Sequence, residues 1–111
     1  MSVPETTDAT FAVDVLASSV PVLVEFTADW CGPCRMLAPV LDQILRDEAG
    51  RLAIVALDVD VNPEITRRYN VMSMPTLALF VNGEIVSQTV GARPRTAILR
   101  EIEPFLTAVA S

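Results

Sequence analysis

The most informative segment of this chain reads Val24-Glu25-Phe26-Thr27-Ala28-Asp29-Trp30-Cys31-Gly32-Pro33-Cys34-Arg35-Met36. An apolar run over residues 22–27 predicts a buried strand that ends inside this segment, and residues 33–49 are typical of a helix. The two cysteines therefore lie where a strand passes into a helix. Amide groups and the dipole at a helix N-terminus stabilise a thiolate, so this position predicts a lowered pKa for the thiol of Cys31.

A dithiol at such a junction can exchange disulfides with other molecules. The thiolate is the attacking species in this exchange, which makes Cys31 the expected nucleophile. Cys34 lies one turn inside the predicted helix, where we expect it to be more shielded and to act as the resolving cysteine. Between them, Gly32 adds no bulk beside the attacking sulfur, and Pro33 lacks an N–H and favours the first helical turn.

Two other uses of the cysteines compete with this interpretation. Free cysteines are often buried simply as small apolar side chains. A zinc or iron–sulfur site would need ligands from a second chain, because two cysteines and no histidine cannot complete a four-ligand site here. We therefore expect no metal. The missing histidine also excludes Ser-His-Asp and Cys-His catalysis.

The rest of the chain alternates between strand-like and helix-like patterns. Further strands are expected at residues 52–57, 76–81 and 84–90, with an N-terminal edge strand, and Asn82-Gly83 predicts a type I′ hairpin turn. Helices are expected at residues 8–17, after an N-cap at Asn62, and from Pro94, where Ile98, Ile102, Phe105 and Val109 share one side. These elements predict an α/β fold with a mixed sheet covered on both faces.

The length and charge of the chain limit its organisation and its partners. Its 111 residues fit one domain over residues 1–111. A formal net charge of −6 argues against nucleic acid and anionic membranes as partners. No run approaches the roughly 18 apolar residues of a membrane span, and the first residues lack the pattern of a secretory signal. We therefore expect a cytoplasmic location.

Several segments together resemble the thioredoxin family. Residues 24–36 are similar to its active-site segment, and further matches are Asp60-Val61-Asn62-Pro63, Met74-Pro75-Thr76, Phe80-Val81-Asn82-Gly83 and Val90-Gly91-Ala92. The resemblance implies the thioredoxin fold, a central mixed sheet of about five strands flanked by four helices. It implies a monomeric general protein-disulfide reductase that acts on oxidised client proteins. It also implies no bound cofactor beyond the Cys31–Cys34 disulfide, which an NADPH-dependent, FAD-containing thioredoxin reductase recharges.

Glu25 is a departure within the family pattern. It lies among apolar residues of a predicted strand, where burial of a carboxylate raises its pKa, unless the side chain faces solvent instead. Thioredoxins usually have Asp at this place, and the resemblance implies that Glu25 transfers a proton to or from Cys34. The lysine that often accompanies that Asp is replaced here by Ala56.

The resemblance also implies a docking groove beside the dithiol. Most X-Pro bonds are trans, but the family's matching proline is cis, so we expect a cis bond before Pro75. An extended substrate can then pair with the backbone of Met74. Trp30 could be a core aromatic but is expected to wall the site, and Met72 and Met74 could be core residues. The expected groove residues are Trp30, Gly32, Pro33, Met74, Pro75, Gly91 and Ala92.

Two further functions remain open on the same fold. Oxidising and isomerising relatives usually carry His between the cysteines, which stabilises the reduced thiolate; Gly32-Pro33 supplies no such charge and favours a reductant. A structural subunit or binding module would need the fold but not the thiols, and the intact cysteine pair argues against it. The departures at Glu25 and Ala56, and at Thr27 where the family commonly has an aromatic residue, are compatible with a specialised paralogue.

Overall fold

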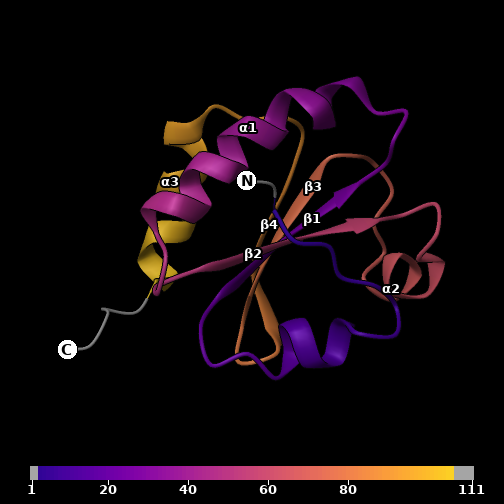
Figure 1. Ribbon diagram of the computed structural model, residues 1–111, viewed down its shortest axis with the longest axis horizontal. Helices are drawn as coiled ribbons and strands as arrows, with labels where there is room; N and C mark the ends of the chain where they lie inside the picture. Colours follow the sequence, from indigo (N-terminus) through magenta and orange to yellow (C-terminus); the bar gives the residue numbers. More distant parts are fainter. Residues whose placement is uncertain (1–2, 107–111) are drawn as a thin grey trace.

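The computed structural model describes residues 3–106 and contains a four-stranded mixed sheet in the order β2-β1-β3-β4 (Figure 1). The strands are β1 (Val22–Thr27), β2 (Ala53–Asp58), β3 (Thr76–Val81) and β4 (Glu84–Val90). β1 pairs parallel to β2 and antiparallel to β3, and β3 pairs antiparallel to β4. The fold is the thioredoxin fold expected from the sequence, with β1 at its centre.

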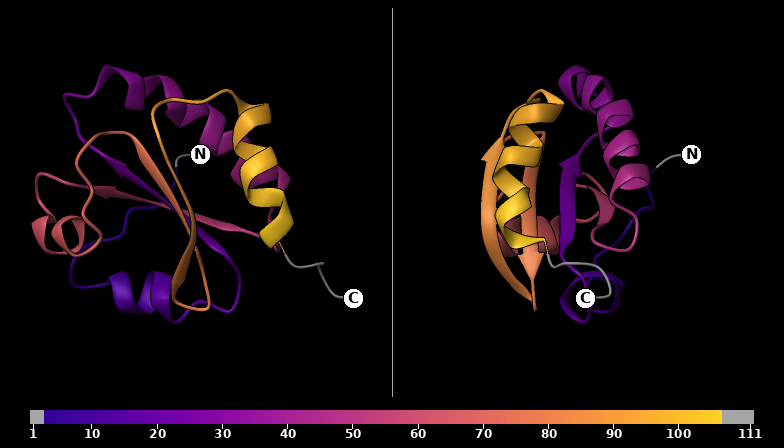
Figure 2. Two further views of the ribbon diagram at one scale, coloured as in Figure 1. Left: turned by 180° about the vertical axis from the view of Figure 1, so that it is seen from behind. Right: turned by 90° about the vertical axis from the view of Figure 1, so that its left-hand side faces the viewer.

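Helices cover both faces of the sheet (Figure 1; Figure 2). α1 (Gly32–Asp47) and α3 (Arg95–Ile102), which continues as the 3₁₀ turn η2 (Glu103–Phe105), cover one face. The short π-helical segment η1 (Ala12–Leu16) and α2 (Pro63–Arg68) cover the other. None of the helices within residues 3–106 is long and apolar enough to cross a membrane. Val109, expected on the last helix, lies outside the described residues.

The expected N-terminal edge strand is reduced to one bridge, so the prediction of about five strands was wrong by one. Glu5 bridges to Ala56 of β2, where Ala56 N–H donates to Pro4 O at 2.8 Å and Thr6 N–H donates to Ala56 O at 2.9 Å. Pro4 has no N–H to continue the ladder. Val3 N–H instead donates to Asp42 Oδ1 on α1 at 3.0 Å, which draws the chain away from the sheet edge.

Local residues form the hairpin turn between β3 and β4, whereas a distant residue caps the start of α2. The hairpin at Asn82-Gly83 is confirmed, because both residues have the positive φ, 53° and 82°, of a type I′ turn. Asn62 is the N-cap of α2, but its side chain does not cap the helix. Asp8 supplies the cap instead, since its carboxylate accepts from Glu64 N–H at 3.1 Å and Ile65 N–H at 2.9 Å.

Candidate active site

The dithiol lies at the N-terminus of α1, directly after the loop that follows β1. Cys31 and Cys34 form a disulfide with their Cα atoms 5.3 Å apart. Cys31 is the N-cap of α1, and its Sγ accepts a hydrogen bond from Cys34 N–H at 3.2 Å, with Pro33 in the first turn. This donor and the helix dipole would stabilise negative charge on the same sulfur after reduction.

The two cysteines are equally buried in the disulfide form. Each is 3 % exposed, so the expected greater shielding of Cys34 is absent in this redox state. Ala28 completes a small apolar cluster with them, and the partly buried Val59 and Met74 pack against it. The disulfide is therefore surrounded by apolar groups on the side that faces the cis-proline loop.

The front of the site carries the residues expected in the docking groove. Trp30 is 63 % exposed, and its indole N–H donates to Asp60 Oδ2 at 2.8 Å, so it is not a core aromatic. The Met74–Pro75 bond is cis, as the family resemblance implied. Gly91 adopts φ +101° and its N–H donates to Pro75 O at 2.8 Å, which places the two loops side by side.

The exposure of the remaining groove candidates differs from residue to residue. Gly32, Pro33 and Ala92 are exposed, Met74 and Gly91 are half-buried, and Pro75 is buried. Met72 is 83 % exposed and is not a core residue. The structure thus brings apolar surface to the mouth of the disulfide, with Trp30 on one side and the cis-proline loop against the cysteines.

The rear of the site is formed by Glu25. It lies in the middle of β1, paired with Ala56 of β2 and Leu77 of β3, and is 5 % exposed, so the solvent-facing alternative is excluded. Within the described part of the chain, its Oε2 has no hydrogen-bond partner. Burial, with a smaller contribution from the negative charge of Asp42, raises the pKa of Glu25 from 4.5 to about 7.

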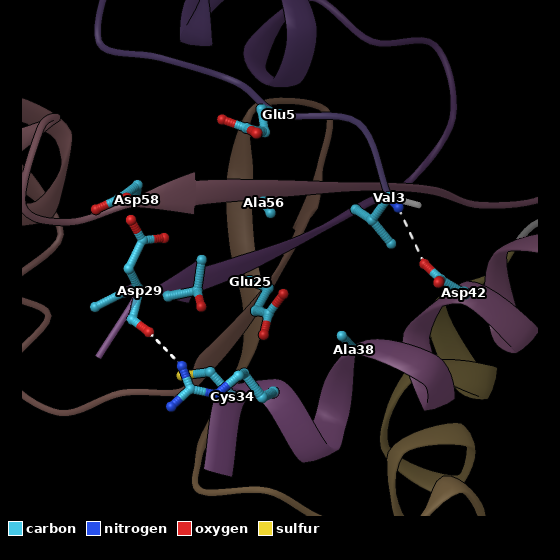
Figure 3. Close-up of a pocket in the computed structure, with 12 residues that line it drawn as sticks. Val3, Glu5, Glu25, Asp29, Cys34, Ala38, Asp42, Ala56 and Asp58 are labelled. Carbon is cyan, nitrogen blue, oxygen red and sulfur yellow. Dashed lines mark hydrogen bonds between the residues drawn. The ribbon is translucent and has the colours of Figure 1, made fainter. Parts of the chain in front are cut away.

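A cavity of about 670 Å³ connects Glu25 with Cys34 behind the disulfide (Figure 3). Its lining residues are Val3, Glu5, Glu25, Thr27, Ala28, Asp29, Cys34, Arg35, Ala38, Asp42, Ala56 and Asp58. The cavity is large enough for water to bridge the carboxyl and the sulfur. Among residues 3–106, no three Cys, Asp or Glu side chains come close enough to hold a metal ion.

Asp42 belongs to this site and was not identified from the sequence. Cys34, Ala38 and Asp42 follow one another at intervals of four residues, so they form one stripe along α1 that faces the cavity. The sequence shows this spacing, because Ala38 and Asp42 follow Cys34 by four and eight residues. Without the position of β1, however, nothing indicated that this stripe faces Glu25.

A disulfide at a helix N-terminus, set against a cis-proline loop, is the arrangement of a thiol–disulfide oxidoreductase. The thioredoxin family profile matches residues 2–104. The chain is 54% identical over 96 residues to a thioredoxin of Mycobacterium tuberculosis, covering 86% of this chain and 83% of that protein. It is 46% identical over 103 residues to a thioredoxin of Synechocystis, covering 93% and 96%.

A third relative combines two activities in one chain. It is named a bifunctional thioredoxin reductase/thioredoxin of Mycobacterium leprae and is 50% identical over 98 residues, which are 88% of this chain and 21% of that protein. With the family match over most of its length, the chain belongs to the thioredoxin family. It is a protein-disulfide reductase whose redox group is its own Cys31–Cys34 pair.

Proposed function

We propose that Cys31 is the nucleophile and Cys34 the resolving residue in the reduction of client disulfides. The hydrogen bond from Cys34 N–H to Cys31 Sγ at the start of α1 supports this assignment, because it favours a thiolate on Cys31. The thiolate attacks one client sulfur, the client S–S bond breaks, and the other client sulfur leaves as a thiolate. Cys34 then attacks Cys31 and releases the second client sulfur, so the client gains two electrons and Cys31–Cys34 is oxidised.

Glu25 is the proposed proton acceptor for Cys34 in the second step. The thiol of Cys34 must lose its proton before it attacks, and the cavity joins the two groups behind the disulfide. A carboxyl with a pKa of about 7 is partly ionised near neutrality and can take that proton, directly or through water. In the reverse direction the same group returns a proton to Cys34 when the disulfide is reduced.

The front groove is the proposed binding surface for an extended client segment. The exposed ring of Trp30 and the contact of Met74 with the cysteine cluster support this role. Backbone pairing with Met74 would hold the client sulfur near Cys31 with little dependence on client side chains. Gly32, Pro33, Pro75, Gly91 and Ala92 shape the surface around the attack point.

The proposed electron donor is a separate thioredoxin reductase that uses FAD and NADPH. The relative that joins reductase and thioredoxin in one chain supports this pairing. We further propose that residues 1–111 act as one monomeric domain in the cytoplasm, with oxidised proteins as clients. The net charge of −6 supports proteins rather than nucleic acid or anionic membranes as partners.

An insulin-reduction assay with NADPH and the cognate reductase tests the dithiol roles. We expect Cys31→Ser to reduce turnover to background and to form no mixed disulfide with clients. Cys34→Ser should also stop turnover but accumulate covalent client complexes, which mass spectrometry would identify. Equal trapping of clients by the two variants would contradict the proposed order of attack.

A further inference from the structure

The cavity behind the dithiol is strongly acidic. Its lining contains five carboxylic acids and one arginine, namely Glu5, Glu25, Asp29, Asp42, Asp58 and Arg35. Besides Glu25 itself on β1, these groups come from the N-terminal segment, the loop after β1, α1 and β2, whereas β3 contributes only the apolar Leu77 opposite Glu25. A cleft lined by charges of one sign raises the local concentration of ions of the opposite sign.

The acids of this cavity lack cationic partners in the described part of the chain. The ion pairs there join Arg51, Arg68, Arg93 and Arg95 to other carboxylates, all outside the cavity. Arg35 lines the cavity, but its guanidinium donates to the backbone oxygen of Asp29 at 2.6 Å and forms no ion pair there. The negative charge is therefore largely uncompensated.

Glu25 is the group that turns this charged surface into a candidate binding site. Its side chain is 5 % exposed and projects into the cavity, and its Oε2 has no hydrogen-bond partner among the described residues (Figure 3). Directly opposite on β2, the methyl group of Ala56 leaves space beside the carboxyl. A buried oxygen without a donor is costly, so a ligand that donates to it gains free energy.

The spacing of the acids fits an elongated ligand better than a metal ion. No three acids within residues 3–106 are close enough to share a metal. Asp58 lies two residues beyond Ala56 on β2, about 7 Å along the strand at the usual rise. Asp58 pairs with Thr27 at the end of β1, and Asp29 follows Thr27 by two residues, so both acids line that end of the cavity (Figure 3).

We propose that this cavity binds a short aliphatic diammonium ion, with one ammonium group against Glu25 and the other between Asp29 and Asp58. A four-carbon chain between the ammonium groups suits this separation. The binding depends on the cavity alone, but its effect on turnover rests on the proposed proton transfer by Glu25. A bound cation would favour the ionised carboxylate, so the ligand would keep Glu25 ready to accept the proton of Cys34.

The test follows the carboxyl carbon of Glu25 by NMR during pH titrations of the oxidised protein, in which Cys31 and Cys34 do not titrate. The probe is 1,4-diaminobutane, compared with butylamine and with sodium chloride at equal ionic strength. We expect a saturable decrease of about one pH unit in the pKa of Glu25 with the diamine. Butylamine should give a smaller decrease, and the salt little change.

Two variants serve as matched controls. Ala56→Leu fills the space beside Glu25 without adding charge and should abolish the response, whereas Asp58→Asn keeps the space and should weaken binding several-fold. The second variant keeps the test valid if the first does not fold. A response to the diamine that does not saturate, that sodium chloride reproduces, or that survives in both variants would overturn the proposal. The readout requires no turnover, so it is separate from any failure of the proton-transfer role.

Discussion

The face of the sheet covered by η1 and α2 is packed with aromatic rings, whereas the face covered by α1 and α3 contains a buried carboxylic acid. On the first face, the ring centroids of Phe11, Tyr69 and Phe80 lie 5.1 to 5.7 Å from one another. On the second, aliphatic side chains pack well until Glu25, where the cavity begins. The first face therefore contributes mainly to stability, while the second gives up packing beside the disulfide, where we propose that Glu25 transfers protons.

The largest effect should come from the aromatic face. Phe80→Ala removes a fully buried ring that contacts Phe11 and Tyr69, and should lower the free energy of unfolding by about 4 kcal/mol. Urea unfolding measures this loss. Insulin reduction per folded molecule should stay unchanged at low temperature. A loss of activity larger than the unfolded fraction would contradict the assignment of stability to one face and chemistry to the other.

Glu25→Gln should act in the opposite direction on stability. A raised pKa means that the folded state holds the proton more tightly than the unfolded chain, so the stability from this proton is complete below about pH 4.5 and is lost as the pH rises through about 7. At pH 8 the ionised, buried Glu25 should cost on the order of 3 kcal/mol. Gln cannot ionise, so the variant should gain stability relative to the native chain between pH 4 and pH 8.

The same variant separates stability from function. Resolution of a preformed mixed disulfide should accelerate in the native chain as the pH rises through about 7, because Glu25 then becomes a base. Glu25→Gln should be slower and lack this inflection in stopped-flow measurements. If Glu25→Gln has the same pH profile as the native chain, Glu25 does not take part in the reaction.

The smallest effect should come from the cap of α2, on the aromatic face. Asp8→Ala removes both acceptors at the start of this helix and should cost about 1 kcal/mol without changing thiol reactivity. Asp8→Asn keeps one acceptor oxygen and should cost less. Thermal unfolding of the two variants gives the comparison, and equal losses would show that charge rather than capping holds the helix.

Patterns confined to neighbouring residues were sufficient for much of this site. The strand-to-helix junction located Cys31 and Cys34, Asn82-Gly83 located the hairpin, and a carboxyl amid apolar residues indicated the burial of Glu25. The cis bond before Pro75 came from the family resemblance, because the local sequence alone favours trans.

Contacts between distant residues were not predictable from such patterns. Asp8 caps α2 through the N–H of Glu64, 56 residues later, and Asp42 lies near Glu25 only because α1 packs across β1. The N-terminal edge strand was predicted, but its reduction to one bridge depended on where Val3 would find an acceptor. Each of these depends on which elements become neighbours in space, and spacing along the chain does not determine that.

Residues 3–8 form hydrogen bonds with three separate elements, which has a practical consequence for protein engineering. Val3 bonds to α1, Thr6 to β2 and Asp8 to α2. A purification tag joined ahead of this segment leaves those bonds in place, whereas a deletion that extends through Asp8 removes all of them at once. Shortened versions of this protein should therefore be trimmed elsewhere.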